Sequence, residues 1–171
     1  MEQRTFRPGD ILVACDNVAE LPSGYVGHSA IVVDSKQIVE ALPQLPFVRK
    51  SNVSSFLEGH PLHVHYRPNE KKTGSHAAKW ALKYVAGYDK NVRKGIKQPE
   101  FSFFSLSSLE DPWEAIYCSK LVWNSYYLGA NYRFPNDYLW FSPEDLASRL
   151  EWDKQFTLLY KHPQFSFKLD T

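Results

Sequence analysis

Two short apolar runs with a polar turn between them place the strongest constraint on the fold of this chain. HSAIVV covers residues 28–33, IVEAL covers residues 38–42, and the polar segment DSKQ joins them. Both runs are rich in β-branched residues, which favour strands. Two such runs with a short polar connection predict a β-hairpin. A tight turn here brings His28 and Glu40, which lie on opposite strands, close to each other.

Three more segments predict strands. GDILVAC at residues 9–15 follows a Pro-Gly break, PLHVHYR at 61–67 alternates in polarity, and KQFTLLYKH at 154–162 is the last strand. Strands come first, helices follow, and one strand closes the chain. This order is typical of an α+β fold and not of a regular βαβ alternation. The length of 171 residues suits a single domain over residues 1–171.

Helical periodicity occurs in three segments. The first begins near Ser75 and has Gly87 as its expected C-cap. The second contains Cys118 and ends at Gly129, and the third, SPEDLASRL, begins with a serine N-cap followed by a proline. Residues 88–109 are polar and contain proline, so we expect a long loop there that is either functional or disordered.

Composition argues against several classes of function. The chain has 20 Lys and Arg against 19 Asp and Glu, a net charge of +1, which argues against a nucleic-acid partner. Its apolar runs are too short to span a bilayer, and the start MEQRTFRPGD lacks the apolar segment of a secretory signal. Two cysteines, Cys15 and Cys118, do not form a disulfide framework. We therefore expect a cytoplasmic protein with two reduced thiols and no integral membrane segment.

Cys118 is either a core residue or a nucleophile. On a helix it shares one face with Leu121, Val122 and Ser125, and this face points inward. A buried cysteine is a common small hydrophobic residue. Reactivity requires in addition a partner that lowers the pKa of the thiol. Helical spacing by itself favours the core interpretation.

His28 and Glu40 are the candidate partners of this thiol. His28 begins a strand directly after Gly27, where a side chain can point into a cleft, and Glu40 lies between apolar residues on the paired strand. A carboxylate there can accept a hydrogen bond from the imidazole and fix its tautomer. The alternative is a half-exposed histidine at a strand end and an acid on an outward face.

His63 and His65 offer a different hypothesis, a zinc site. The two residues would face the same side of a strand, but zinc needs a third ligand and a fourth position. No Cys-x-x-Cys or His-Glu-x-x-His motif accompanies them, and neither a Gly-rich phosphate loop nor a Gly-x-Ser-x-Gly elbow is present. We therefore predict no metal and no other cofactor.

Five segments in order along the chain resemble a known family. GDILVA, GHSAIVV, IVEALP, AGYD and YCSKLVW are similar to the circularly permuted branch of the NlpC-type papain-fold cysteine peptidases and amidases, the YiiX/YebB/YaeF-like proteins. The resemblance covers most of the chain, from Gly9 to about Gly129. It implies an antiparallel sheet or small barrel packed against helices, with the catalytic cysteine at a helix N-terminus. The permutation accounts for the order His, Glu, Cys.

The resemblance implies a role for individual residues. Cys118 corresponds to the nucleophile, His28 to the general base, and Glu40 to the third member that orients the histidine. Tyr88 corresponds to a tyrosine at the oxyanion position, and Tyr117 is a further candidate for the oxyanion or for substrate contact.

The sequence departs from the family pattern in four places. Lys120 replaces an acid that often follows the cysteine, FVRK at 47–50 stands where a Gly-Val pair is common, and Gly87 replaces a proline. The stretch between Tyr88 and Cys118 is also long. In addition, a helix beginning at Asp111 would put Cys118 in its second turn. Following the family, we predict a separate turn at 112–115 and a main helix from about Tyr117.

The resulting hypothesis is a thiol hydrolase that cleaves an amide bond through a Cys-His-Glu triad and an acyl-enzyme. The resemblance favours a small cell-wall-derived peptide or an amino-acid amide as substrate. One alternative is a lipid acyl hydrolase or acyltransferase of the lecithin:retinol acyltransferase-like type, although YCSK does not match the Asn-Cys-Glu of those enzymes. The other is a non-catalytic ligand-binding module on the same fold.

Overall fold

The computed structural model describes residues 4–15, 26–103, 107–136 and 140–168. Its central element is a six-stranded sheet in which all neighbouring strands are antiparallel, with the spatial order β4-β3-β2-β1-β5-β8. The strands are β1 (Ile11–Ala14), β2 (His28–Val32), β3 (Gln37–Ala41), β4 (Val48–Asn52), β5 (His63–Pro68) and β8 (Phe156–Lys161). The predicted hairpin is confirmed as the β2–β3 pair.

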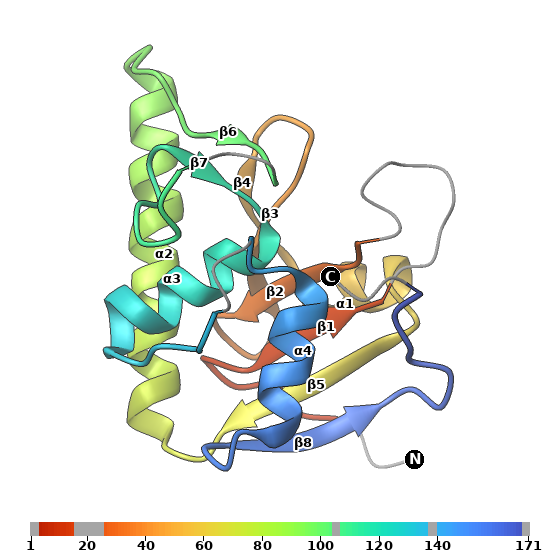
Figure 1. Cartoon of the computed structure of the whole chain (residues 1–171). Coiled ribbons are helices and arrows are strands. Elements are labelled where there is room, and N and C mark those ends of the chain that lie inside the picture. The colour runs from red at the N-terminus through yellow and green to blue at the C-terminus, as the bar shows by residue number, and fades with distance from the viewer. Residues whose placement is uncertain (1–3, 16–25, 104–106, 137–139, 169–171) are drawn as a thin grey trace.

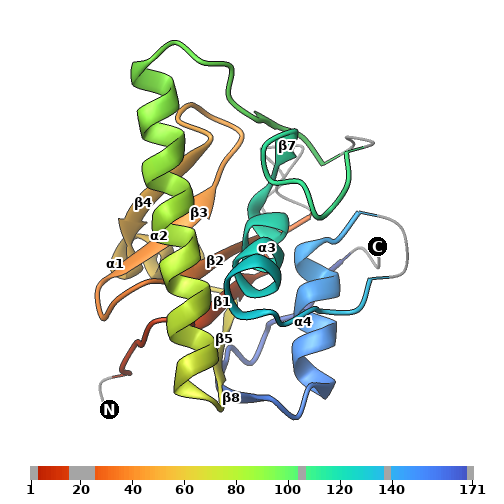
Figure 2. The same ribbon diagram turned by 90° about the vertical axis from the view of Figure 1, so that its left-hand side faces the viewer.

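Helices cover both faces of this sheet (Figures 1 and 2). The helices are α1 (Val53–Gly59), α2 (Lys71–Arg93), α3 (Cys118–Ala130) and α4 (Pro143–Trp152). Apolar residues of α2, α3 and α4 share one core cluster with one face of the sheet, and those of α1 share a second cluster with the other face. Within the described ranges, none of these helices is both long and apolar enough to cross a membrane.

Strand alternation explains the two cores. Ile11 and Val13 of β1 lie in the cluster with α2, α3 and α4, whereas Leu12 and Ala14 lie in the cluster with α1. Ile31 of β2 faces the first cluster in the same way. Because both faces are covered, every residue of β1 and β2 is buried. These two strands therefore form a rigid base for the candidate site.

The first long helix extends further than its pattern predicts. We expected an end at Gly87, but α2 continues to Arg93, and Gly95 with φ of +65° follows it. Gly87 lies inside the helix, where its lack of a side chain lets the Trp113 ring pack closely. The predicted loop from Tyr88 was therefore wrong over its first six residues, which are helical.

No sequence pattern predicted β4 or α1, because these elements are short or polar. β4 is an edge strand with mostly exposed side chains, so it lacks the apolar alternation that identifies strands. A second small sheet pairs β6 (Glu100–Phe101) with β7 (Ala115–Ile116) in parallel. The predicted N-cap of α4 is confirmed, because Ser142 and Asp145 form a capping box.

Candidate active site

Cys118 is the first residue of α3. A turn at residues 112–114 and the short strand β7 precede it, as expected from the sequence, and Tyr117 is the extended N-cap. The side chain of Tyr117 makes no capping hydrogen bond to this helix end. The first N–H groups of a helix have no partner within the helix and carry a partial positive charge. Cys118 is only 1% exposed, so the thiol lies at a buried, electropositive helix end.

His28 and Glu40 are brought together by the register of the hairpin. Glu40 of β3 lies opposite Ala30 of β2, so its side chain points to the same face as that of His28, two residues earlier. The His28 Nε2 and Glu40 Oε2 atoms are 2.9 Å apart in a buried hydrogen bond. Glu40 thereby fixes the orientation of the imidazole and leaves Nδ1 as the ring nitrogen for the thiol.

Arg49 holds the second oxygen of this carboxylate. It lies opposite Glu40 on β4, and its Nε donates to Glu40 Oε1 at 2.9 Å. Burial opposes ionisation of Glu40, but His28 and Arg49 outweigh this effect and hold the pKa of the carboxyl below its usual value. Sequence reasoning missed Arg49, although FVRK at this place was a departure from the family pattern.

The Cys118 thiol and the His28 imidazole lie close enough to shift the pKa of each other. Burial disfavours the charged imidazole, but Cys118 and Glu40 outweigh it and raise the pKa of His28 to about 10. Burial would also raise the pKa of the thiol, whereas His28 and Ser29 lower it below its usual value. Both shifts favour a thiolate–imidazolium pair.

Two aromatic rings from the α1 side restrict the imidazole. The Phe56 ring is stacked on His28 with centroids 5.6 Å apart, and the His60 ring is 4.9 Å away.

The start of β2 depends on Gly27, which directly precedes His28. Gly27 has φ of +81°, and a Cβ atom there would lie 2.4 Å from the carbonyl oxygen of Ala14. Only glycine fits this position, which sets the start of β2 and hence the place of His28.

The two candidate tyrosines are both buried and both accept a backbone hydrogen bond. The Tyr88 hydroxyl accepts from the N–H of Phe47 at 3.1 Å, and the Tyr117 hydroxyl accepts from the N–H of Phe141 at 3.1 Å. Among the described residues, no hydrogen bond joins either hydroxyl to Cys118. Their assignment to the oxyanion or to substrate therefore stays a prediction.

Lys120, which stands where the resembled family often has an acid, makes a structural contact. It is only 1% exposed, and its Nζ donates to the carbonyl oxygen of Ser108 at 2.8 Å and to Ser107 Oγ at 3.2 Å. Burial lowers the pKa of this amine to about 8, although Asp111 and Glu114 oppose the shift. The side chain thus fastens the segment before β7 to the first turn of α3.

The two histidines of β5 have other partners than a metal. His63 Nδ1 bonds the carbonyl oxygen of His60 at 2.8 Å, and Arg4 donates to its Nε2 at 2.9 Å. Burial, with help from the Arg4 charge, lowers the pKa of His63 to about 4, so this ring is neutral. His65 Nε2 bonds Asp10 Oδ2 at 2.8 Å.

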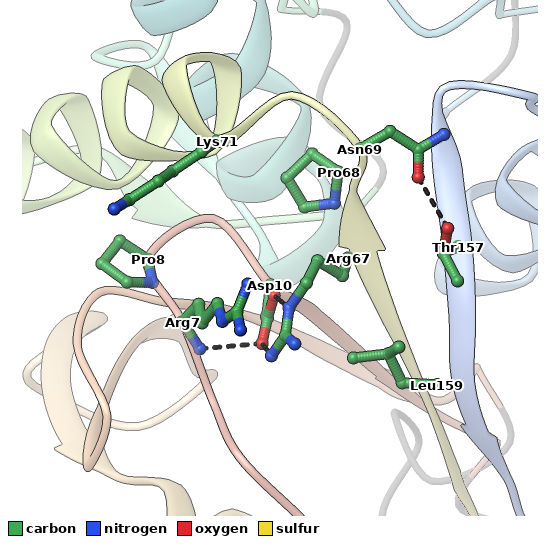
Figure 3. Close-up of a pocket in the computed structure, with 9 residues that line it drawn as sticks. All are labelled: Arg7, Pro8, Asp10, Arg67, Pro68, Asn69, Lys71, Thr157 and Leu159. Atoms are coloured by element: carbon green, nitrogen blue, oxygen red, sulfur yellow. Dashed lines mark hydrogen bonds and ion pairs between the residues drawn. The ribbon is translucent and has the colours of Figure 1, made fainter.

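Asp10 is the centre of a second polar cluster, away from Cys118. Its carboxylate accepts bonds from Arg67 and from the backbone N–H of Arg7, and it borders a pocket of about 230 Å³ (Figure 3). Burial opposes its ionisation, but Arg67 and His65 hold the pKa of Asp10 below its usual value. Asp10 precedes β1, whereas His28 pairs with Ala14 at the opposite end of that strand, so the pocket is separate from the candidate active site.

Comparisons with known proteins place the fold. No family model matches this sequence, and no curated protein matches it. Among solved structures, the chain is similar to one described as the metalloprotein yiiX from Escherichia coli O157:H7. The superposition has a TM-score of 0.57 at 17% sequence identity and covers 91% of this chain and 97% of that one.

The residues that the structure describes do not fit a metal centre. Across the described ranges, no group of three or more His, Cys, Asp or Glu side chains is placed to hold a metal ion. The Nε2 atoms of His28 and His65 are each bonded to a carboxylate. What this chain shares with yiiX is the architecture: it has a YiiX-like α+β fold.

Proposed function

We propose that this protein is a cysteine hydrolase in which Cys118 is the nucleophile, His28 the general base and Glu40 the residue that orients the histidine. The observation that carries the proposal is the connected set of thiol, imidazole and carboxylate at the start of α3. A nucleophile, a base within reach and a third group that orients the base are the requirements for covalent catalysis.

The first step forms a bond between sulfur and carbon. His28 holds the proton that leaves Cys118, and the thiolate attacks the carbonyl carbon of the substrate, whose oxygen becomes negative. The uncapped start of α3 offers the backbone N–H of Cys118 as a donor to this oxygen. One such donor is typically worth about 3 kcal/mol. Tyr88 accepts a bond from Phe47, so its own hydroxyl proton remains for a second donation.

The second step releases the products. The His28 imidazolium gives its proton to the leaving amine, the C–N bond breaks, and an acyl group remains on Cys118. His28 then takes a proton from water, which attacks the thioester carbon. The C–S bond breaks, the acid leaves, and the thiol is restored.

We further infer that the fold is a circularly permuted papain-like one. The histidine and the acid lie on consecutive strands, and the helix with the cysteine comes after them in the chain. This order is the one that the resemblance implies. By the same resemblance, we propose a small cell-wall-derived peptide or an amino-acid amide as substrate.

One feature supports the alternative, an ester of a lipid acyl group. The rings of Phe103 and Trp140 are half-buried, and Phe103 packs against Tyr117, the residue before the nucleophile, with centroids 5.3 Å apart. An apolar surface beside the thiol suits an acyl chain. A panel of amide peptides and acyl esters assayed with the same enzyme distinguishes the two substrate classes.

Turnover by point variants tests the proposal. We expect Cys118→Ala and His28→Ala to abolish hydrolysis of every accepted substrate while the circular dichroism spectrum is unchanged. Cys15→Ala is the matched control, because Cys15 is also buried but directly follows β1 and donates to the carbonyl oxygen of Leu62. A Cys118→Ala protein that still turns substrate over would disprove the mechanism. An intact protein that binds ligand without turnover would indicate a binding module.

A further inference from the structure

Ser29 is a buried polar residue with an unusual environment. It follows His28 directly, is 0% exposed, and its hydroxyl makes no geometrically regular hydrogen bond within the described part of the chain. A buried hydroxyl without such a bond lowers stability. Native structures contain few of these groups, and those that persist often serve a function.

The strand register places Ser29 beneath the start of α3. Side chains alternate along β2, so Ser29 shares a face with Ile31, which lies in the same core cluster as Leu121 and Val122 of α3. The helix packs against this strand (Figure 2). The first turn of α3 carries Cys118, and Ser29 lies on the face of β2 that this helix covers.

Ser29 interacts there with the sulfur atom of Cys118. Both the backbone N–H and the hydroxyl of Ser29 interact with the Cys118 sulfur, and after burial, which acts in the opposite direction, they join His28 in lowering the pKa of the thiol. A neutral thiol is a weak acceptor, whereas a thiolate is a strong one. The Ser29 hydroxyl therefore gains its partner when Cys118 loses its proton.

We propose that Ser29 is a positioning residue, whose hydroxyl donates a hydrogen bond to the Cys118 thiolate. The inference rests on the proposed function, since it assigns a second donor to the same nucleophile. His28 takes the proton from sulfur, and the S–H bond is replaced by an N–H bond on the imidazole. Ser29 keeps its own proton and directs it at the sulfur.

This role predicts that the effect of Ser29→Ala on stability depends on the charge of Cys118. Above the pKa of the thiol, where Cys118 is a thiolate, the substitution removes a donor to it, so we expect the melting temperature to fall; below that pKa the hydroxyl lacks a regular partner, so we expect the melting temperature to stay the same or to rise. The same change removes a donor to the thiolate, so the pKa of Cys118 rises. We expect an increase of about one unit, and hence about tenfold slower alkylation at pH values below that pKa.

Ser125 provides a matched control on α3. It is also 0% exposed, but its Oγ donates to the carbonyl oxygen of Leu121 at 2.7 Å. Ser125→Ala breaks this bond, so it should lower the melting temperature and leave the pH profile of Cys118 unchanged. Ser29→Thr keeps a hydroxyl at the site and suits a strand, so it should keep the thiol pKa close to that of the wild type.

The experiment measures the alkylation rate of Cys118 by iodoacetamide against pH, with peptide-level mass spectrometry, and the melting temperature of each variant. A folded Ser29→Ala protein with an unchanged profile overturns the inference. A Ser29→Ala protein whose melting temperature falls as that of Ser125→Ala does, while the pKa of Cys118 stays the same, also overturns it. The wild type separates this failure from that of the proposed function: if Cys118 itself is alkylated as slowly as Cys15, the nucleophile assignment fails before any serine variant is compared.

Discussion

At the scale of single residues, the carboxylate of Glu40 connects the site to the rest of the sheet. One of its oxygens bonds His28 and the other bonds Arg49, each at 2.9 Å. A buried carboxylate held from two sides has little freedom to rotate, so the imidazole that it bonds is also fixed. This arrangement orients Nδ1 of His28 toward Cys118 before any substrate arrives.

The charge of His28 follows from its two partners. A raised His28 pKa adds stability that is complete below pH about 6.5 and is lost as the pH rises through about 10. The lowered thiol pKa acts in the opposite sense: it adds stability above about pH 8.5 that is lost as the pH falls. Because the pH ranges of these two effects on stability overlap, the titration of His28 itself is a clearer measurement than the pH dependence of stability.

We expect the removal of the thiol to lower the pKa of His28. In Cys118→Ala the strongest group that raises this pKa is gone, so NMR titration of the imidazole should show a value below about 10, nearer the ordinary histidine value of about 6.5. Cys15→Ala should leave the titration unchanged. An imidazole that already titrates near pH 6.5 in the wild type would contradict the ion pair.

At the scale of elements, the start of β2 depends on one backbone conformation. Gly27 has φ of +81°, and a side chain there would collide with the carbonyl oxygen of Ala14. We expect Gly27→Ala to cost roughly 2 kcal/mol of unfolding free energy, measured by urea denaturation, and to slow Cys118 alkylation by moving His28.

Gly59 is the matched control for this prediction. It ends α1, has no neighbouring atom within 4 Å of a built Cβ, and does not have a positive φ. Gly59→Ala should therefore change the unfolding free energy by no more than about 1 kcal/mol and leave alkylation unchanged. Equal effects of the two substitutions would show that the conformation of Gly27 does not position His28.

At the scale of the whole molecule, the site joins two halves of the chain. His28 and Glu40 come from the β2–β3 hairpin, whereas Cys118 comes from α3, and the core between sheet and helices holds them together. The pKa of the thiol is therefore lowered only in the folded domain. Cys118 should lose its distinct reactivity at the same urea concentration at which the fold is lost.

Local patterns predicted the parts of the site that depend on short-range geometry. The hairpin brings His28 to Glu40, and the helix start at Cys118 agrees with the extended N-cap Tyr117. Arg49 was missed because polar edge strand β4 has no apolar alternation. Gly87 was misassigned as a helix end because its reason, contact with Trp113, is a tertiary one. Such contacts join distant segments, and periodicity does not record them.

The pH dependence of Cys118 alkylation tests the central claim most directly. If the thiol is paired with His28, iodoacetamide should label Cys118 well below about pH 8 and far faster than Cys15, and His28→Ala should abolish this early labelling. Cys15 serves as the internal reference in the same protein. Slow labelling of both cysteines only above about pH 8, unchanged by His28→Ala, would contradict the account.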